Sequence, residues 1–321
     1  MPVSRLSEVW QDVERVARAG GAVRVGASEL TDHHAARFDE WIASGQHASM
    51  AYLAKNAAVR RDPQSRYPWA KSAIVIVVPY ASERPDAPPG ALSHHVARYA
   101  LGDDYHQVLE QMLRDVEEAL NAIDSTVRTW RYVDTGPLSD RALAAQAGLG
   151  WIGRNSMLLD QEIGSYFFIG TLLTSLENDI TAMTAADRCG TCTRCVEACP
   201  TDAILPNRTV DSARCISYAT IEHRGALDDD LAQHLDGNAF GCDICQEVCP
   251  WNRPGVPLPA HPSFEPREAY RNTPVTDLLR FAQSDFSELF RKSAVKRAKL
   301  AGMQRNVEAL TNGGSRGTVT E

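Results

Sequence analysis

The stretch Cys189-Gly-Thr-Cys192-Thr-Arg-Cys195-Val-Glu-Ala-Cys199-Pro200 contains four of the eight cysteines of the chain. Its spacing, C-x-x-C-x-x-C-x-x-x-C-P, is the one with which bacterial proteins hold a 4Fe-4S cluster. The other four cysteines stand at positions 215, 242, 245 and 249, so that none is left over. This second group also ends in a proline, Pro250, but an insertion separates its first cysteine from the rest. The cysteine block therefore predicts two 4Fe-4S clusters that pass electrons.

The order of the cysteines also predicts which of them share a cluster. In two-cluster ferredoxins the fourth cysteine of each run binds the other cluster, because it starts a helix and points away from its own loop. We therefore expect one cluster on Cys189, Cys192, Cys195 and Cys249, and the other on Cys199, Cys215, Cys242 and Cys245. A pair of zinc sites is the alternative, because C-x-x-C also suits tetrahedral zinc. The third cysteine within the loop and the C-P endings favour iron-sulfur clusters.

The composition is that of an ordinary soluble protein of 321 residues, long enough for two or three folding units. A net charge of -8 argues against non-specific adhesion to nucleic acid, so a polyanionic partner requires a local basic patch. Residues 1–10 contain no signal-peptide core or twin arginine, and the apolar runs are too short to span a bilayer. We therefore expect a cytoplasmic protein, in which clustered cysteines are metal ligands rather than disulfides.

Apolar periodicity divides the chain into three parts. Helical spacing is followed by short apolar runs, which predicts helices over 6–16, 104–123 and 139–147 and strands over 22–26, 72–78, 127–133 and 166–174. We expect a first domain of mixed helices and strands over 1–185 and a cluster domain over 186–255. Prolines recur from Pro254 to Pro266 and indicate a linker, and 275–309 has a helical pattern. The third part, 256–321, is therefore predicted to be a linker and a helical segment.

Asp134 follows a predicted strand in the stretch Tyr132-Val-Asp-Thr-Gly-Pro-Leu-Ser-Asp-Arg141. The carboxyl ends of strands in α/β folds usually expose the functional site. A partly buried carboxyl group there could act as a general acid, because desolvation raises its pKa toward neutrality. The alternative is a turn aspartate that caps the next helix. Asp-Thr-Gly also occurs in aspartic proteases, but those need two such loops and this chain has one.

Two further stretches are unusual for plain connections. Gly148-Leu-Gly-Trp-Ile-Gly153 matches the dinucleotide fingerprint, but it follows a predicted helix where the fingerprint requires a strand, so we exclude a Rossmann site. The loop could still bring backbone close to a flat or phosphate-bearing cofactor, or it could only connect two elements. Arg98-Tyr-Ala-Leu-Gly-Asp-Asp-Tyr-His106 places Arg, Asp, Tyr and His just before a helix, which an aspartate there can cap.

A basic segment lies near the carboxyl end. Six arginines and lysines occur on one probable helical stretch: Arg291, Lys292, Lys296, Arg297, Lys299 and Arg305. Clustered positive charges on an acidic protein localise phosphate binding to one patch. A solvated helix face is the alternative.

Taken together, these stretches resemble the epoxyqueuosine reductases, cobalamin-dependent iron-sulfur enzymes that complete the base queuosine in tRNA. The resemblance runs from about residue 5 to residue 310. It rests on 98–106, 134–141, 147–155, 164–168 and the eight cysteines with the displaced Cys215. No single stretch is sufficient, but their order and spacing together are specific.

The resemblance implies an α+β fold with three parts. These are a cobalamin-binding catalytic domain similar to nitroreductases and reductive dehalogenases, a ferredoxin-like domain with two 4Fe-4S clusters, and a short HEAT-like helical segment. It implies that Asp134 is the proton donor. The cobalamin contacts fall on Arg60, Arg98, Asp134, Asn155, Met157 and Ser165. The D-x-H-x-x-G signature of a lower cobalt ligand is absent, which would ease reduction of the cobalt.

The implied reaction is the two-electron reduction of epoxyqueuosine to queuosine at the tRNA wobble position, on a looped-out base. Many relatives have a longer carboxyl-terminal extension, so here the tRNA contacts are expected on Arg141, His223, Arg224, Lys296, Arg297 and Lys299. We expect a monomer that receives electrons from a carrier such as flavodoxin or ferredoxin. A reductive dehalogenase and a non-catalytic electron-transfer protein are the alternatives. The first usually has a twin-arginine signal and a tyrosine donor, and the second would contain no cobalt.

Overall fold

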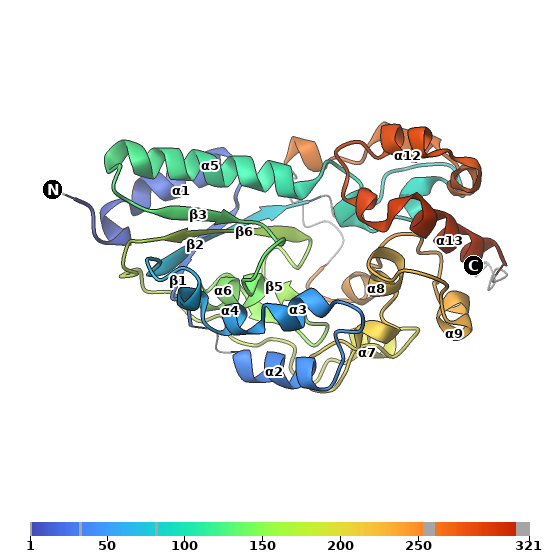
Figure 1. The fold of residues 1–321 in the computed structure, drawn as a ribbon, viewed down its shortest axis with the longest axis horizontal. Helices are drawn as coiled ribbons and strands as arrows, with labels where there is room; N and C mark the ends of the chain where they lie inside the picture. Colours follow the sequence, from blue (N-terminus) through green and yellow to red (C-terminus); the bar gives the residue numbers. More distant parts are fainter. Residues whose placement is uncertain (1, 32–33, 81–82, 253–260, 313–321) are drawn as a thin grey trace.

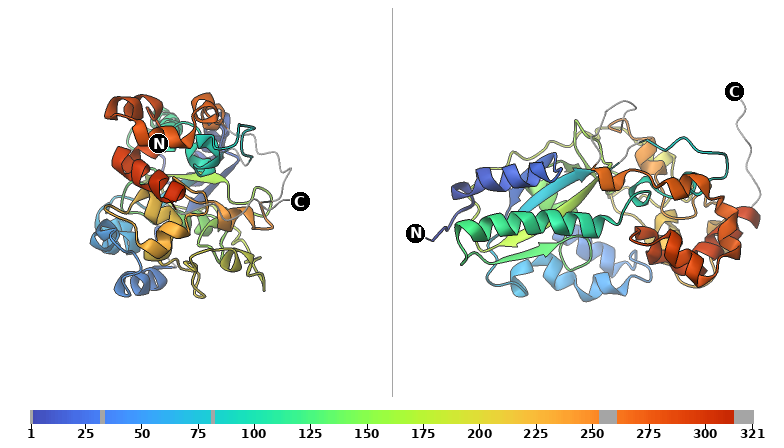
Figure 2. Two further views of the ribbon diagram at one scale, coloured as in Figure 1. Left: turned by 90° about the vertical axis from the view of Figure 1, so that its right-hand side faces the viewer. Right: turned by 90° about the horizontal axis from the view of Figure 1, so that it is seen from above.

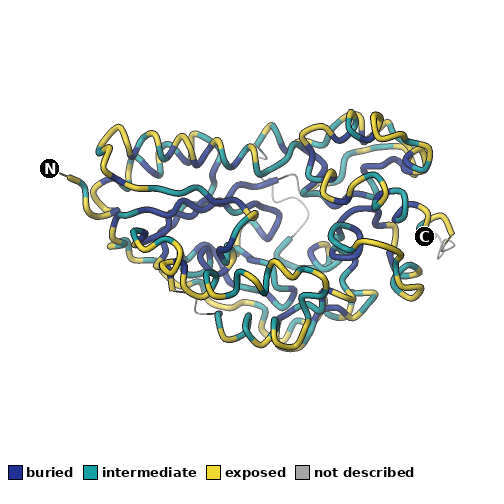
Figure 3. Tube along the Cα trace, in the orientation of Figure 1, coloured by how far each residue is buried: buried dark blue, intermediate teal, exposed yellow. Residues whose placement is uncertain are grey.

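The centre of the protein is a four-stranded antiparallel sheet with the order β1-β2-β6-β3 (Figure 1). The computed structural model describes residues 2–31, 34–80, 83–252 and 261–312. The strands are β1 (Arg24–Ser28), β2 (Ser72–Pro79), β3 (Thr129–Tyr132) and β6 (Phe167–Thr174). Strand β2 pairs with β1 on one side and with β6 on the other. Every residue of β2 is buried (Figure 3), because helices or loops cover both faces of the sheet.

The alternating side chains of β2 supply two separate cores. Ile74, Ile76 and Val78 point to one face and pack against α1 (Trp10–Ala19) and α5 (Tyr105–Ile123). These two helices lie over the sheet when it is seen from above (Figure 2). Residues 73, 75 and 77 point to the other face, where they pack with residues of α6 (Asp140–Gln146) and β5 (Leu158–Leu159). The β-branched run is therefore a fully buried strand, as its composition predicts.

The second face carries the smaller elements. Strands β4 (Trp151–Ile152) and β5 form a separate two-stranded sheet. Helices α2 (Ala35–Ala43), α3 (Ala51–Lys55) and α4 (Ala57–Arg61) lie beyond it and continue toward the cysteine block (Figure 1). The 3-10 turns are Leu6–Glu8, Pro63–Ser65, Leu92–His94, Arg98–Ala100, Ser212–Arg214, Pro262–Phe264, Val275–Arg280 and Ala294–Ala298.

The cysteine block contains only short helices. These are α7 (Arg194–Glu197), α8 (Ile216–Ile221), α9 (Asp229–Gln233) and α10 (Ile244–Glu247). Helices α7 and α10 contact each other. Residues 239–241 pair with residues 95–97 of the first domain through the bridge of Val96 with Phe240 and the hydrogen bond from Ala97 N to Phe240 O, 2.8 Å long. The block is thus anchored directly to the first domain.

The carboxyl-terminal segment forms a third core with the 91–101 stretch. Its helices are α11 (Glu268–Asn272), α12 (Gln283–Leu289) and α13 (Lys299–Asn312). Their apolar side chains enclose Leu92, Leu101 and Phe240. The expected helical run over 275–309 is helical in parts but broken, and both Lys292 and Lys299 have positive φ angles, 54° and 63°. A left-handed residue cannot continue a right-handed helix, which explains the breaks.

Two expectations need correction in the structure. The proline-rich stretch is not a free linker throughout, because Phe264 is buried in the first core, with its ring 4.7 Å from that of Phe168; residues 253–260 lie outside the described residues. The sheet is antiparallel, so the rule on the carboxyl ends of parallel strands does not apply to Asp134. The predicted strands and main helices are otherwise present. Among the described residues, no helix has the length and apolar character that a bilayer crossing requires.

Candidate active site

Asp134 lies in a tight loop directly after β3. Its φ angle is +54°, a left-handed conformation that aspartate tolerates better than most residues. The loop is fixed from behind: the Tyr132 hydroxyl donates to the carbonyl oxygen of Asp134 at 2.8 Å, and Arg60 donates to the carbonyls of Gly136, at 2.9 Å, and Leu138. The Asp134 side chain is left 62% exposed. The loop therefore presents an exposed carboxylate from a backbone that Tyr132 and Arg60 hold by hydrogen bonds.

Two side chains from the first turn of α5 reach the Asp134 carboxylate. The Tyr105 hydroxyl donates to Oδ2 at 2.8 Å, and Nε2 of His106 lies 3.5 Å from the same oxygen. On its other side, Nδ1 of His106 lies 2.7 Å from Oδ1 of Asp104. Asp104 also caps α5 by accepting the His106 amide at 3.1 Å. The imidazole thus stands between two carboxylates.

The charges of this group differ from the sequence expectation. Burial lowers the pKa of His106, but the hydrogen bonds to Asp104 and Asp134 outweigh it and raise the pKa to about 9. Although the Asp134 side chain is 62% exposed, the surrounding protein atoms reduce its hydration and so raise its pKa. The hydrogen bonds from His106 and Tyr105 and the charges of His106 and Arg60 outweigh this effect and hold the pKa below the ordinary value. The expectation that burial would raise the pKa of Asp134 toward neutrality was therefore wrong. The mobile proton rests on His106, beside an ionised Asp134.

In an NMR titration of the imidazole protons, His106 is expected to lose its proton near pH 9 instead of 6.5. Because the folded pKa lies above the unfolded one, this interaction stabilises the fold below about pH 6.5 and is lost as the pH rises through about 9. Asp104→Asn should lower the midpoint. Asp103→Asn is the matched control, because Asp103 pairs with Arg267 at 2.7 Å. A midpoint near 9 in Asp104→Asn would contradict the pairing.

The residues expected at cobalamin fall into two groups. Arg60 holds the Asp134 loop from behind. Arg98, Asn155 and Ser165 instead face the segment 243–247: the Ser165 hydroxyl donates to Oε1 of Gln246 at 2.8 Å, the Asn155 amide lies 3.5 Å from the Cys245 carbonyl, and Arg98 pairs with acidic side chains. Met157 follows Asn155, whose Oδ1 accepts the Met157 amide at 3.2 Å. The second group therefore lies at the junction with the cysteine block.

Several buried polar atoms in this region have no hydrogen-bond partner among the described residues of the protein. Three of them are Nε of Arg60, Nε of Arg98 and Oδ1 of Asp140. Buried polar atoms are rarely left without partners unless a ligand, ion or water supplies them. Burial, and then the charge of Asp134, also raise the pKa of Asp140 well above its ordinary value. The residues therefore fit a large polar cofactor.

Two glycines of the loop 148–153 lie close to other parts of the chain. A side chain on Gly148 (φ +74°) would lie 2.5 Å from the carbonyl oxygen of Met183, and one on Gly150 (φ +149°) would lie 2.3 Å from that of Leu159. The loop leads into β4, in the hairpin with β5. These glycines permit close packing of the chain against itself. This packing accounts for Gly148 and Gly150 in the way that the alternative of a connecting loop predicts.

The eight cysteines form two groups of mutually close thiols. All eight are free and partly buried. After burial, the charges that raise the pKa of Cys195 come from Cys249, Cys189 and Cys192. Burial, and then charges including those of Cys215 and Cys199, raise the pKa of Cys242 to about 12.

One interaction crosses between the groups. After burial, the charges of Cys242 and Cys215 raise the pKa of Cys245, and so does that of Cys195. Since Cys195 is in the other group, this interaction links the two groups. No three His, Cys, Asp or Glu side chains of the described chain surround a single metal ion. A cluster differs from zinc in that each thiolate binds its own iron, so its thiolates stand further apart.

The expected tRNA contacts are divided between two places. Arg224 and Arg297 lie together, because Nη2 of Arg224 donates to the Arg297 carbonyl at 2.9 Å. Arg297 also pairs with Glu222 at 2.7 Å. His223 stands next to this pair, and Lys296 and Lys299 are exposed on the same segment. Arg141 lies elsewhere and donates to the Ser156 carbonyl.

Arg305, from the basic segment, is not available to a phosphate. It donates to the carbonyl of Ala219, in α8, and to those of His223 and Gly225, which follow α8. These distances are 2.7 to 3.0 Å. Sequence reasoning missed this role, and it also missed Asp243, Arg84 and the bond of Tyr105 to Asp134. The charged residue between Cys242 and Cys245 was the available signal for Asp243.

Two family models match the sequence. Residues 60–135 match the model described as "Epoxyqueuosine reductase QueG, DUF1730", and residues 188–252 match the "4Fe-4S double cluster binding domain". The epoxyqueuosine reductase of Cyclobacterium marinum is 37% identical over 318 residues, which cover 97% of this chain and 99% of that protein. That of a Synechocystis species is 38% identical over 87% of this chain and 95% of that protein.

Solved structures share the whole fold. A crystal structure of epoxyqueuosine reductase with an epoxyqueuosine-modified tRNA-Tyr stem loop has a TM-score of 0.85 and 30% identity, and the match covers 95% of this chain and 81% of that one. The enzyme of Bacillus subtilis, in a form with its catalytic aspartate loop swung out of the active site, has a TM-score of 0.84 and 29% identity over the same shares. The α+β class is confirmed. Because a relative 37% identical spans almost the whole of both proteins, this chain belongs to the epoxyqueuosine reductase family.

Proposed function

We propose that this protein reduces epoxyqueuosine to queuosine in tRNA. The observation that carries the proposal is the match over the full length to epoxyqueuosine reductases, including 99% of the Cyclobacterium marinum protein. The conversion of an epoxide to an alkene consumes two electrons and two protons and releases water. The protein must therefore supply protons at the substrate oxygen and a route for electrons.

Asp134 is the group that meets the substrate oxygen, because its side chain is exposed and its loop is held by hydrogen bonds from Tyr132 and Arg60. In the free protein it is ionised, so it must first take up a proton. His106 can supply that proton, since Nε2 is 3.5 Å from Oδ2 of Asp134 and the imidazole is protonated at neutral pH. Asp104 holds the imidazole in place from the opposite side. Tyr105 keeps the carboxylate oriented.

Cobalamin, when bound and reduced, would supply the electron pair that opens the epoxide. Arg60, Arg98, Asp134, Asn155, Met157 and Ser165 are proposed to hold it. Their partnerless polar atoms, Nε of Arg60 and Nε of Arg98, are free to meet its amide groups or phosphate. Asn155 and Ser165 also touch the segment 245–246, so this side of the site lies against the cysteine block.

The two cysteine groups are proposed to hold the 4Fe-4S clusters as the sequence predicts. One cluster takes Cys189, Cys192, Cys195 and Cys249, and the other takes Cys199, Cys215, Cys242 and Cys245. The charge of Cys195 contributes to the raised pKa of Cys245, so the two sets lie within electrostatic range of each other, which supports electron transfer from one cluster to the other. Junction residues Asn155 and Arg98 lie next to the second set.

The partner is proposed to be the anticodon stem-loop of a tRNA. Arg224, Arg297, Lys296 and Lys299 form a basic surface with His223, and Arg141 lies near the glycine loop. Contacts to phosphate would make binding weaken with salt. A one-electron carrier such as flavodoxin or ferredoxin is proposed as the electron donor, and the enzyme is proposed to act as a monomer in the cytoplasm.

The test is an anaerobic assay of the protein reconstituted with iron, sulfide and cobalamin. Epoxyqueuosine-containing tRNA and a strong chemical reductant are added, and the nucleosides are analysed by mass spectrometry. Queuosine is the expected product, and omission of cobalamin should abolish it. If the loaded protein forms none, the proposal is wrong. Product formed equally well without cobalamin would exclude the cofactor assignment.

A further inference from the structure

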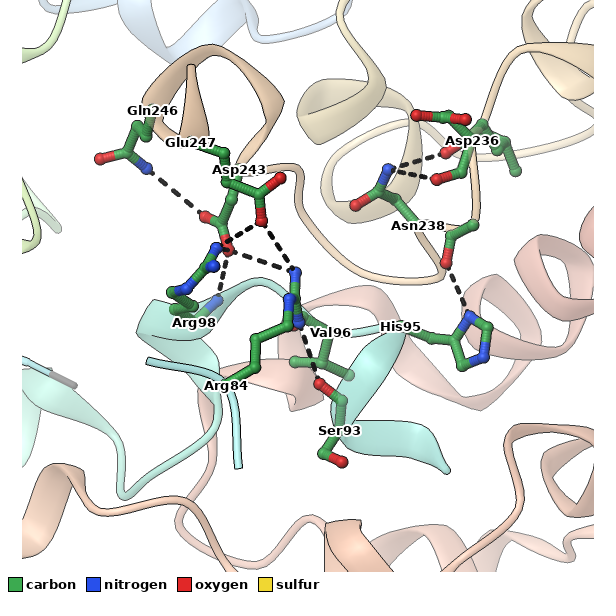
Figure 4. Close-up of polar contacts among 12 residues, drawn as sticks. Arg84, Ser93, His95, Val96, Arg98, Asp236, Asn238, Asp243, Gln246 and Glu247 are labelled. Atoms are coloured by element: carbon green, nitrogen blue, oxygen red, sulfur yellow. Dashed lines mark hydrogen bonds and ion pairs between the residues drawn. The ribbon is translucent and has the colours of Figure 1, made fainter. Parts of the chain in front are cut away.

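A buried ion-pair network joins the first domain to the segment between Cys242 and Cys249 (Figure 4). Arg98 lies with Nη1 3.3 Å from Oδ2 of Asp243 and 2.5 Å from Oε1 of Glu247. Arg84 reaches the same two oxygens at 3.6 and 3.7 Å. Two positive and two negative groups therefore meet at one place, and none of them takes part in the proton transfer described above.

Asp243 is the most deeply buried member of this network. Its side chain is 2% exposed, whereas that of Glu247 is 39% exposed. The carboxylate also accepts the backbone amide of Arg98 at 2.8 Å and lies 3.4 Å from the Gln246 side-chain amide. A buried charge is tolerated only with such partners, because removing an isolated charge from water is costly. Arg84 and Arg98 are therefore the partners that favour the ionised form of this buried carboxylate.

Both sides of the network are fixed relative to the cysteines. Asp243 stands directly between Cys242 and Cys245 in the sequence. Arg84 is held by the carbonyls of Ser93 and Val96, at 2.9 and 3.0 Å. The segments around Gly241 and Ala97 are in close contact, since a Cβ atom added to Gly241 would lie 2.6 Å from Cβ of Ala97. These contacts hold the charged side chains of Asp243 and Arg84 in place beside the cysteines, also when a cluster bound there gains or loses an electron.

We propose that Asp243 and its two arginines set the reduction potential of the cluster bound by Cys199, Cys215, Cys242 and Cys245. The inference rests on the cluster assignment in the proposed function. Reduction adds one negative charge to a cluster, and potentials depend on nearby charge and solvent exposure. A fixed carboxylate opposes that charge and lowers the potential, while a fixed guanidinium favours it and raises the potential. The balance between Asp243 and the arginines decides the value.

The exposed fractions predict an order of effects. Solvent screens exposed charges much more than buried ones. Removal of the Asp243 charge should therefore shift the potential further than removal of the Glu247 charge. Both shifts have the same direction, toward more positive values, and removal of the Arg84 charge has the opposite direction.

The test is a redox titration of the reconstituted protein followed by EPR, without cobalamin or RNA. Dithionite and mediators poise the potential, and iron and sulfide are measured first for each variant. Asp243→Asn should raise one of the two midpoints, Glu247→Gln should raise it less, and Arg84→Gln should lower it. Arg84→Lys keeps the charge and should leave the midpoint close to that of the wild type. Asp230→Asn, at a side chain 85% exposed on α9, is the control for carboxylate loss and should cause no shift.

The signs separate an electrostatic role from a structural one. A merely structural network would lose iron, or would move the midpoint in the same direction in Asp243→Asn and Arg84→Gln. Fully loaded variants with unchanged midpoints would also overturn the inference, while the proposed function would stand. Absence of any 4Fe-4S signal in the loaded wild type would overturn both. Glu247→Gln, at the partly exposed position, serves as the test if Asp243→Asn does not fold.

Discussion

Replacing Asp134 by asparagine is expected to lower the rate of queuosine formation by about 10²–10⁴-fold, the usual contribution of a positioned general acid. The amide has nearly the same shape as the carboxyl group but cannot pass on the proton of His106. Asparagine also tolerates the left-handed backbone, φ +54°, so the loop should keep its conformation. The measurement is the single-turnover rate of nucleoside conversion under anaerobic conditions.

Two controls distinguish loss of the Asp134 proton donor from loss of the bound clusters and cofactor. Iron and sulfide contents of the variant should equal those of the wild type, because Asp134 is far from the cysteines in sequence and exposed at its side chain. Cobalamin content is measured for each protein, and the rate is compared per cobalamin bound, because Asp134 is also a proposed cobalamin contact. Tyr105→Phe removes one hydrogen bond to the carboxylate but leaves the proton route through His106, so its loss should be much smaller. A normal rate for the fully loaded Asp134→Asn protein would exclude Asp134 as the donor.

Pairs of cysteine substitutions are expected to abolish turnover and to show which thiols share a cluster. Cys199→Ala with Cys215→Ala should remove one cluster and leave about four iron atoms per chain, since both belong to the same proposed set. Cys195→Ala with Cys215→Ala should remove both clusters, because these two belong to different sets. Both variants lose the electron route, so queuosine formation should fall below detection.

The two double variants differ because the fourth cysteine of the first run, Cys199, is proposed to bind the other cluster. Cys199 lies in the first run of the sequence with Cys195, yet it should behave like the distant Cys215. Iron content and the EPR signal of the reduced protein give the count. Equal iron loss in both double variants would contradict the grouping. A third double variant, Cys189→Ala with Cys249→Ala, should also retain about four iron atoms per chain, because both cysteines are assigned to the first cluster.

The sequence was most informative where chemistry depends on local spacing. The cysteine runs, the buried strand β2 and the cap at Asp104 could all be recognised from neighbouring residues. The strand order could not, because β2 pairs with β6, almost one hundred residues later, and only tertiary contacts decide that. The ionisation of Asp134 was misjudged for the same reason. Its partner His106 comes from another element, and the hydrogen bond between them outweighs burial.

During synthesis, the 91–101 stretch leaves the ribosome long before the helices that bury it. Leu92 and Leu101 pack against Tyr270, Phe290 and Val307, so they stay exposed to solvent until nearly the whole described chain has been made. All eight cysteines emerge in that interval. The junction beside Cys242 can close only after translation of α13, because contacts so distant in sequence form late. Iron and sulfide therefore have an open, partly folded acceptor for a limited time, and a chain shortened within α13 would keep that apolar surface exposed to chaperones and proteases.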